Sequence, residues 1–133
     1  MAISRREFLA SAAAGAAVLA AGNGFAQQTG SKSEVYVGKG SASEMLPKIL
    51  EKMGGISRFV KQDSRVLIKV NMSFPNPPEW GTGTSPEAVF TLAKMCIEAG
   101  AKRVIVCDNT IRDPEHCKEK TGIAAAIKDL KGS

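Results

Sequence analysis

Two short aliphatic runs flank a single helix signal in the second half of this 133-residue chain. The runs are residues 66–70 and 104–107, rich in Val, Ile and Leu. Continuous apolar runs of this length are typical of strands that are buried on both faces. A strand, a helix and a second strand in this order form a βαβ unit with parallel strands and a right-handed crossover. The pattern predicts an α/β fold with a partial, Rossmann-like parallel open sheet.

The helix between the two runs has a clear start and a clear end. Ser85 supplies a capping hydroxyl, Pro86 fits the first helical position and Glu87 adds a carboxylate to the first turn. Gly100 ends the helix. Apolar residues recur at helical spacing and predict one buried face. They are Val89, Leu92, Ala93, Cys96 and Ile97.

The chain before and after this unit carries weaker signals. Residues 27–34 are polar and predict a flexible spacer, and residues 35–37 predict a short strand. Residues 41–44 form a capping box that starts a helix to about Met53, although Pro47 makes its first turns doubtful. A last helical stretch, 122–130, starts another crossover, but no further strand follows. We therefore expect residues 35–133 to be the N-terminal part of a larger α/β domain.

The N-terminal segment 1–26 has the three parts of a secretory signal: a positive start, an apolar middle and a small-residue exit. Arg5, Arg6, Phe8 and Leu9 match the twin-arginine export consensus, and Ala26 is the expected cleavage position. The apolar middle is too short for a permanent membrane span. The segment predicts export by the twin-arginine translocation machinery to the periplasm or an equivalent compartment.

Charge and cysteine content exclude several classes of function. The net charge of +5 is scattered, without basic runs interleaved with aromatic residues, so nucleic acid is not an expected partner.

The cysteine spacing excludes further classes of site. No C-x-x-C motif occurs, so these residues alone predict no zinc ribbon or ferredoxin-type cluster. Cys96 is expected in the core. Cys107, His116 and Cys117 leave three alternatives open: a weak metal site, a disulfide between the two cysteines, or unpaired residues.

Several segments together resemble one known family. They are residues 66–71, 77–81, 84–87, 98–106 and the triplet 121–123. These segments are similar to the N-terminal part of the bacterial and archaeal domain of unknown function family number 362, over residues 35–130. The resemblance implies an α/β domain with a ligand pocket. Some family members are larger and carry iron–sulfur clusters in a cysteine-rich, ferredoxin-like section, which would lie beyond residue 133 here.

Polar side chains follow both predicted strands. Lys69 and Asn71 end the first strand, and Asp108 follows the second. Carboxyl ends of parallel strands share one edge, where open α/β sheets bind ligands. An ammonium there requires a carboxylate, a phosphate or water. We therefore predict that Lys69 and Asp108 are catalytic candidates, with Asp108 as a general base or metal ligand. The alternatives are a Lys69 that reaches to solvent or pairs with Asp108, and an Asp108 that forms an Asx turn.

The loop 71–84 is long for a compact domain, and such loops are usually functional. Trp80 is predicted either to form a wall over a small molecule or to plug the sheet edge. Thr84 and Ser85, at the start of the helix, and Asn109, after the second strand, complete the predicted ligand-binding set.

Three hypotheses about function follow. The first is an exported α/β protein that binds a small anionic molecule at the strand ends, with enzymatic activity left open. The second is an iron–sulfur redox protein whose cluster ligands lie beyond residue 133. The third is a non-catalytic fragment, which predicts the absence of a cooperative melt.

Overall fold

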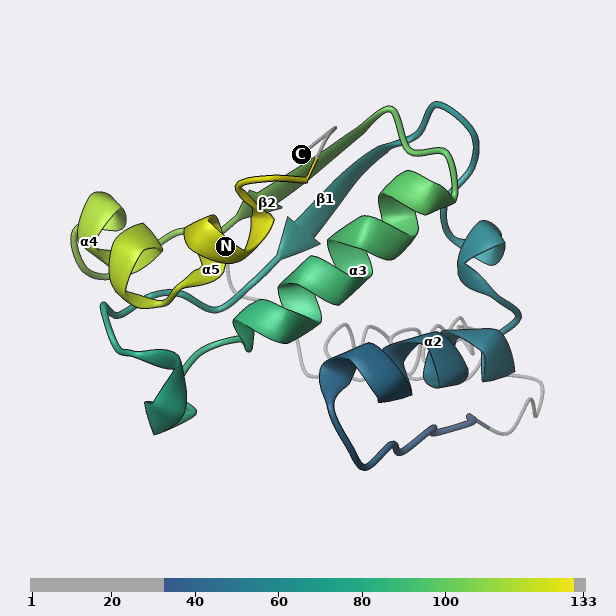
Figure 1. Ribbon diagram of the computed structural model, residues 1–133, viewed down its shortest axis with the longest axis horizontal. Helices are drawn as coiled ribbons and strands as arrows, with labels where there is room; N and C mark the ends of the chain where they lie inside the picture. The colour runs from purple at the N-terminus through teal and green to yellow at the C-terminus, as the bar shows by residue number, and fades with distance from the viewer. Residues whose placement is uncertain (1–32, 131–133) are drawn as a thin grey trace, which may run out of the picture. The chain divides into compact units, whose positions relative to one another are not determined.

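The computed structural model describes residues 33–130, and the compact unit that carries the helices and strands begins at Tyr36. Figure 1 shows the elements. In chain order they are α2 (Ala42–Lys52), the 3-10 turn η1 (Ile56–Arg58), β1 (Arg65–Lys69), the 3-10 turn η2 (Pro78–Trp80), α3 (Pro86–Glu98), β2 (Arg103–Cys107), α4 (Pro114–Lys120) and α5 (Ile123–Ile127).

The predicted βαβ unit is confirmed. β1 and β2 are parallel neighbours, and α3 crosses between them. The register pairs Arg65 with Arg103 and Lys69 with Cys107, so both strands start and end at the same level. The carboxyl ends of the two runs therefore lie at one edge, as the sequence predicted.

The helix α3 forms as its sequence signals indicate. The Ser85 hydroxyl accepts a hydrogen bond from the Ala88 N–H at 3.4 Å, and Pro86 occupies the first turn. After α3, Gly100 has a φ of 93°, which favours glycine and lets the chain turn into β2. Val89, Ala93 and Cys96 on α3 are buried in one apolar core with residues of both strands.

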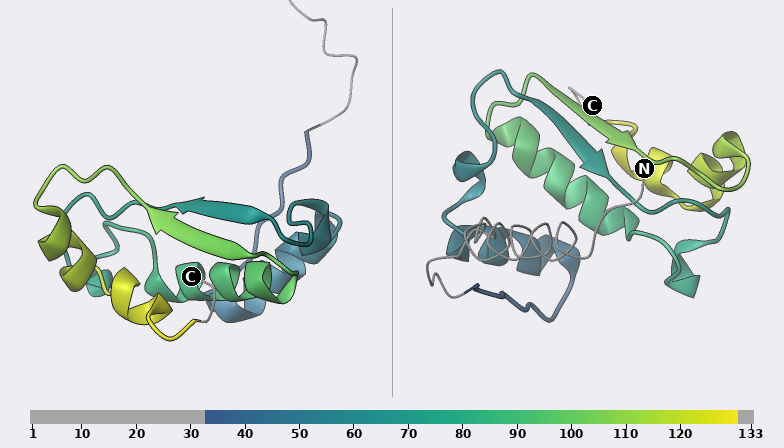
Figure 2. Two further views of the ribbon diagram at one scale, coloured as in Figure 1. Left: turned by 90° about the horizontal axis from the view of Figure 1, so that it is seen from above. Right: turned by 180° about the vertical axis from the view of Figure 1, so that it is seen from behind.

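The prediction that the strands are buried on both faces is wrong for the described residues. Ile68 is buried, whereas its neighbour Leu67 is 63% exposed. The left view of Figure 2 shows α2, α3 and α5 on the same side of the sheet. Each strand alternates between its two faces, so only one set of side chains meets these helices. The apolar outer residues explain why the sequence is typical of a strand covered on both sides.

The capping box at the start of α2 is confirmed. The Ser41 hydroxyl accepts from the Glu44 N–H, and the Glu44 carboxylate accepts from the Ser41 N–H. Pro47 lies inside α2, and the helix continues past it. The Glu87 carboxylate of α3 accepts hydrogen bonds from the Ser43 hydroxyl at 2.7 Å and from the Ser43 N–H at 3.0 Å, which links α2 to α3.

The predicted strand at residues 35–37 is wrong. Val37 is 90% exposed and forms no part of a strand. The next residue, Gly38, packs against α2 so closely that a Cβ there would lie 2.9 Å from Ile49 Cδ1. A three-residue run forms a strand only when a neighbouring strand supplies hydrogen-bond partners. Here residues 36–39 lie alongside α2 instead.

The C-terminal helical stretch differs from its predicted bounds. The stretch predicted at 122–130 forms α5, which ends at Ile127, and it is preceded by α4, a helix that the sequence did not lead us to expect. The start of α4 has an aspartate cap: Asp113 accepts from the His116 N–H at 2.9 Å, and Pro114 follows it. This is the same combination of cap, proline and glutamate that correctly predicted α3. Gly122, with a φ of 71°, separates the two helices.

Candidate strand-end site

Lys69 and Asp108 are brought together at the ends of the two strands. The Lys69 ammonium lies 2.6 Å from Asp108 Oδ1. The Asp108 side chain is 3% exposed, whereas that of Lys69 is 64% exposed. A buried carboxylate is therefore paired with an ammonium group whose side chain is largely exposed to solvent. Pairing with Asp108, one of the alternatives predicted for Lys69, is the arrangement observed.

Asp108 accepts further hydrogen bonds from the protein. Its Oδ2 accepts from the Met72 N–H at 2.8 Å and from the Ser73 hydroxyl at 3.1 Å, while Oδ1 accepts from the Asn109 N–H at 2.9 Å. The Lys69 ammonium and then the Met72 N–H lower the pKa of Asp108 to about 2, against the opposing effect of burial. Asp108 is therefore ionised at neutral pH and joins the segments that follow β1 and β2.

Met72 and Ser73 were missed as members of this site. They lie directly after the strand-end residues of β1, in the segment that passes the end of β2. The signal available in the sequence was a serine two residues beyond Asn71, facing a carboxylate one residue beyond β2. Parallel strands that end at the same level bring these two segments together.

Asn71 and Thr84 close the base of the long loop. The Asn71 N–H donates to the Thr84 hydroxyl at 2.8 Å, and the Thr84 N–H donates to the Asn71 carbonyl at 2.9 Å. Gly83 approaches the same carbonyl, because a Cβ there would lie 2.9 Å from it. The loop thus leaves β1 and returns to α3 at the same point, which places Asn71, Thr84 and Ser85 beside the strand end.

Trp80 and Asn109 are both exposed. Trp80, in η2, is 67% exposed, so the prediction that it plugs the sheet edge is wrong. Its predicted role as a wall over a ligand stays a prediction. Asn109 follows Asp108 directly, and its N–H donates to the Asp108 carboxylate at 2.9 Å. The predicted Asx turn would need the N–H of Thr110 as the donor instead, and residues 108–110 form no turn.

The three cysteines are unpaired thiols in this structure. Cys96 and Cys117 are buried, and burial raises the pKa of the Cys96 thiol. Of the alternatives left open for Cys107 and Cys117, the disulfide does not form. Within residues 33–130 no group of three or more His, Cys, Asp or Glu side chains is arranged to hold a metal ion.

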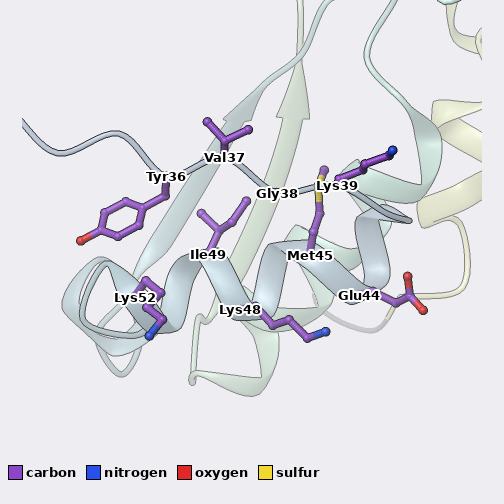
Figure 3. Close-up of a pocket in the computed structure, with 9 residues that line it drawn as sticks. All are labelled: Tyr36, Val37, Gly38, Lys39, Glu44, Met45, Lys48, Ile49 and Lys52. Atoms are coloured by element: carbon purple, nitrogen blue, oxygen red, sulfur yellow. The ribbon is translucent and has the colours of Figure 1, made fainter.

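Two hollows border α2 and β1. One, of about 270 Å³, lies between residues 36–39 and α2, where Met45 and Ile49 point toward Val37 and Gly38 (Figure 3). In this view the side chains of Lys39 and Lys48 both extend to the right, and their ammonium groups lie apart. The other, of about 500 Å³, runs along the whole of β1 as far as Lys69 and is also lined by apolar residues of η1, α2 and α3.

The export prediction concerns other residues. Arg5, Arg6, Phe8, Leu9 and Ala26 lie outside the described residues, so the signal and its cleavage stay predictions. In the described part of the chain, every helix is too short or too polar to pass through a lipid bilayer.

Comparison with known proteins gives a family and one similar protein. The thylakoid-associated protein sll1697 of Synechocystis sp. is 41% identical over 63 residues, which cover 47% of this chain and 20% of that protein. The chain thus spans about a fifth of the length of this relative. No solved structure matches the chain.

The family match covers the elements that build the candidate site. The family model described as domain of unknown function DUF362 matches residues 66–133, which are 68 of the 133 residues. The match begins later than the predicted span of 35–130, but it includes β1 from Val66 onward, the long loop, α3 and β2. The chain therefore belongs to the DUF362 family of domains of unknown function.

Proposed function

We propose that this chain is an exported α/β protein that binds a small anionic molecule at the carboxyl ends of β1 and β2. The observation that carries the proposal is the Lys69–Asp108 pair, in which a nearly buried carboxylate holds an ammonium group that is 64% exposed. Pairs of two exposed side chains contribute little, because both partners are free to move. Here Asp108 is fixed by three further hydrogen bonds, which position Lys69 as well.

The Lys69 ammonium has a donor to spare. An ammonium carries three N–H donors. One is directed to Asp108 Oδ1 and another to the Val70 carbonyl. The third can be donated to a carboxylate or phosphate oxygen that approaches from solvent. The two protein contacts restrict where that donor points, which lowers the entropy lost on binding.

Further polar groups lie in the segments that follow β1 and β2. The hydroxyl groups of Thr84 and Ser85 accept hydrogen bonds from backbone N–H groups, and each retains its own O–H as a donor. Asn109 adds an exposed amide side chain after β2. The Asn71 amide donates to the Thr82 carbonyl at 3.4 Å and keeps a second N–H as a donor. These donors, together with the exposed Trp80, favour an anion with a polar or planar body as the ligand.

The charge state of Asp108 favours binding over catalysis by this residue. Since its pKa lies at about 2, Asp108 is a weak acceptor for a proton at neutral pH. We assign it the role of positioning Lys69. Lys69 remains a catalytic candidate in two cases. Either the ligand reacts with the lysine amine, or the positive charge of the ammonium group stabilises a charge that develops on the ligand.

The proposal is tested by titrating the isotope-labelled chain with inorganic phosphate and, separately, with acetate, while amide NMR signals are followed. We expect the signals of Asn71, Thr84 and Ser85 to shift with saturation. Lys69→Met is expected to weaken this binding about tenfold, the size of a lost charge-assisted hydrogen bond. Lys69→Arg should retain most of the affinity, because the charge is kept.

Lys94→Met is the matched control. Lys94 also pairs with a carboxylate, that of Glu98 at 3.7 Å, but it lies on α3 away from the strand ends. Its loss should leave the titration unchanged. Unaltered shifts in the Lys69→Met protein would remove the strand-end site from consideration.

The iron–sulfur hypothesis concerns a longer form of the protein. Its predicted ligands lie beyond residue 133, so the residues described here neither supply nor replace them. Absorption and electron paramagnetic resonance spectra of a longer gene product, purified without air, would test it. The anion-binding proposal does not depend on the result.

A further inference from the structure

Three basic side chains gather at the opposite edge of the sheet, where β1 and β2 begin. Arg65, Lys102 and Arg103 line a hollow of about 370 Å³. Arg65 and Arg103 are partners in the parallel register, so their side chains leave neighbouring strands on the same face. Like charges directly opposite each other in a sheet are destabilising. This arrangement therefore costs free energy unless an anion lies between the two arginines.

The three basic side chains form no ion pair with the described acidic residues. The ion pairs found within residues 33–130 join Lys69, Lys94, Lys118 and Lys120 to acidic partners, and none includes Arg65, Lys102 or Arg103. All three basic residues are exposed. Their guanidinium and ammonium donors are thus available to a ligand from solution.

The backbone below these side chains is firmly fixed. The Lys102 N–H donates to the Ser64 carbonyl at 2.8 Å, and the Asp63 N–H donates to the Gly100 carbonyl at 2.8 Å. Asp63 and Gly100 both have positive φ values, 62° and 93°. Two tight turns are therefore joined directly, and they hold the starts of the two strands together. Only the side chains need to be ordered when an anion binds, which favours affinity.

We propose that Arg65, Lys102 and Arg103 form a second anion site, specific for a phosphate-type group. Arginine donates paired N–H groups in a planar fork that matches two oxygens of a phosphate, and two arginines from adjacent strands can hold one phosphate between them. The site lies at the amino ends of the strands, at the opposite edge from Lys69 and Asp108. It is independent of the function proposed above.

The outer face next to this site is apolar. Leu67 follows Arg65 on the same face of β1 and is 63% exposed, and its register partner is Ile105. A ligand with a phosphate group and an apolar part can place the phosphate at the arginines and the apolar part across Leu67. Two sources share this chemistry: a free phosphate compound and the headgroup of an anionic lipid.

The experiment follows amide NMR signals of the full chain during titration with inorganic phosphate. We expect the signals of Ser64, Arg65, Lys102 and Arg103 to shift as a group. Arg103→Gln should weaken this binding about tenfold, because it removes one charge-assisted, two-pronged contact. Arg112→Gln is the matched control, since it removes one exposed arginine that lies beyond the other end of β2. It should leave the affinity unchanged.

A second arm distinguishes the two sources. The chain is sedimented with vesicles of phosphatidylglycerol and, separately, of phosphatidylcholine. Arg103-dependent binding to phosphatidylglycerol alone indicates a lipid headgroup, whereas phosphate binding without sedimentation indicates a soluble ligand. Equal weakening by Arg103→Gln and Arg112→Gln would overturn the proposal, because the attraction would then depend only on net charge. Phosphate shifts confined to Asn71 and Thr84 would also overturn it, and would leave the strand-end site intact.

Discussion

At the scale of single residues, Asp108 has the largest structural role at the candidate site. Its carboxylate joins the Lys69 ammonium, the segment after β1 and the segment after β2. The ion pair and the hydrogen bonds all favour the ionised form, which is why its pKa is lowered. The same contacts that position a ligand-binding lysine therefore also stabilise the fold.

This linkage predicts a specific pH dependence of stability. The folded pKa of Asp108, about 2, lies below its ordinary value of 3.8. The stabilisation is therefore complete above about pH 4 and is lost as the pH falls through about 2. Thermal melts between pH 7 and pH 2 should show a steeper fall in Tm below pH 4 for the wild type than for Asp108→Asn.

The variant Asp129→Asn is the control for this experiment. Asp129 is exposed and forms none of the ion pairs found in the structure. Its melts should follow those of the wild type at each pH. Parallel pH profiles for the wild type and Asp108→Asn would show that ionisation of Asp108 does not stabilise the fold.

At the scale of elements, the fold depends on helices that cover one face of a two-stranded sheet. α3 contacts both strands, and α2 and α5 pack against α3. Ile123, at the start of α5, is 2% exposed and belongs to the same core as Val89 and Val104. α5 is only five residues long, so its position depends on this packing rather than on its own helix stability.

Truncation of Ile123 should therefore be costly. Ile123→Ala is expected to lower the free energy of unfolding by about 2–5 kcal/mol, since it leaves a cavity in a close-packed core. Ile111→Ala is the control, because Ile111 is 70% exposed, and its effect should stay within about 0.5 kcal/mol. Urea unfolding followed by circular dichroism measures both. A wild-type chain without a cooperative transition would instead support the hypothesis of a non-catalytic fragment.

At the scale of the whole molecule, the chain combines a predicted export signal with a domain of the DUF362 family. Export by the twin-arginine route depends on the arginine pair itself, because the machinery reads it as an address. The signal and the folded unit therefore make separate contributions, and they can be tested separately.

Fusion of residues 1–26 to a fluorescent reporter tests the signal. We expect export to an extracytoplasmic compartment in cells with the twin-arginine machinery, and cleavage after Ala26, measured by mass spectrometry of the processed N-terminus. The double variant Arg5→Lys, Arg6→Lys keeps the charge and should abolish export. Continued export of the double variant, or export in cells without the machinery, would contradict the prediction.

The sequence predicted those features that depend on local chemistry. The two apolar runs, the Ser85 cap, Gly100 and the capping box at Ser41 each gave the correct element, because hydrogen bonds at helix ends and backbone conformations are decided within a few residues. The same kind of signal at Asp113 and Pro114 was available for α4 and was overlooked.

The sequence by itself determined the βαβ unit and the end of the sheet at which Lys69, Asn71 and Asp108 lie, because parallel strands joined by one helix end at the same side of the sheet. Only the tertiary structure decided that Met72 and Ser73 donate hydrogen bonds to Asp108. It also decided that residues 35–37 form no strand and that Leu67 faces outward. These features depend on contacts between residues far apart in the chain. An apolar run is the same in sequence whether one or both of its faces are covered, and only the packing of the helices decides between them.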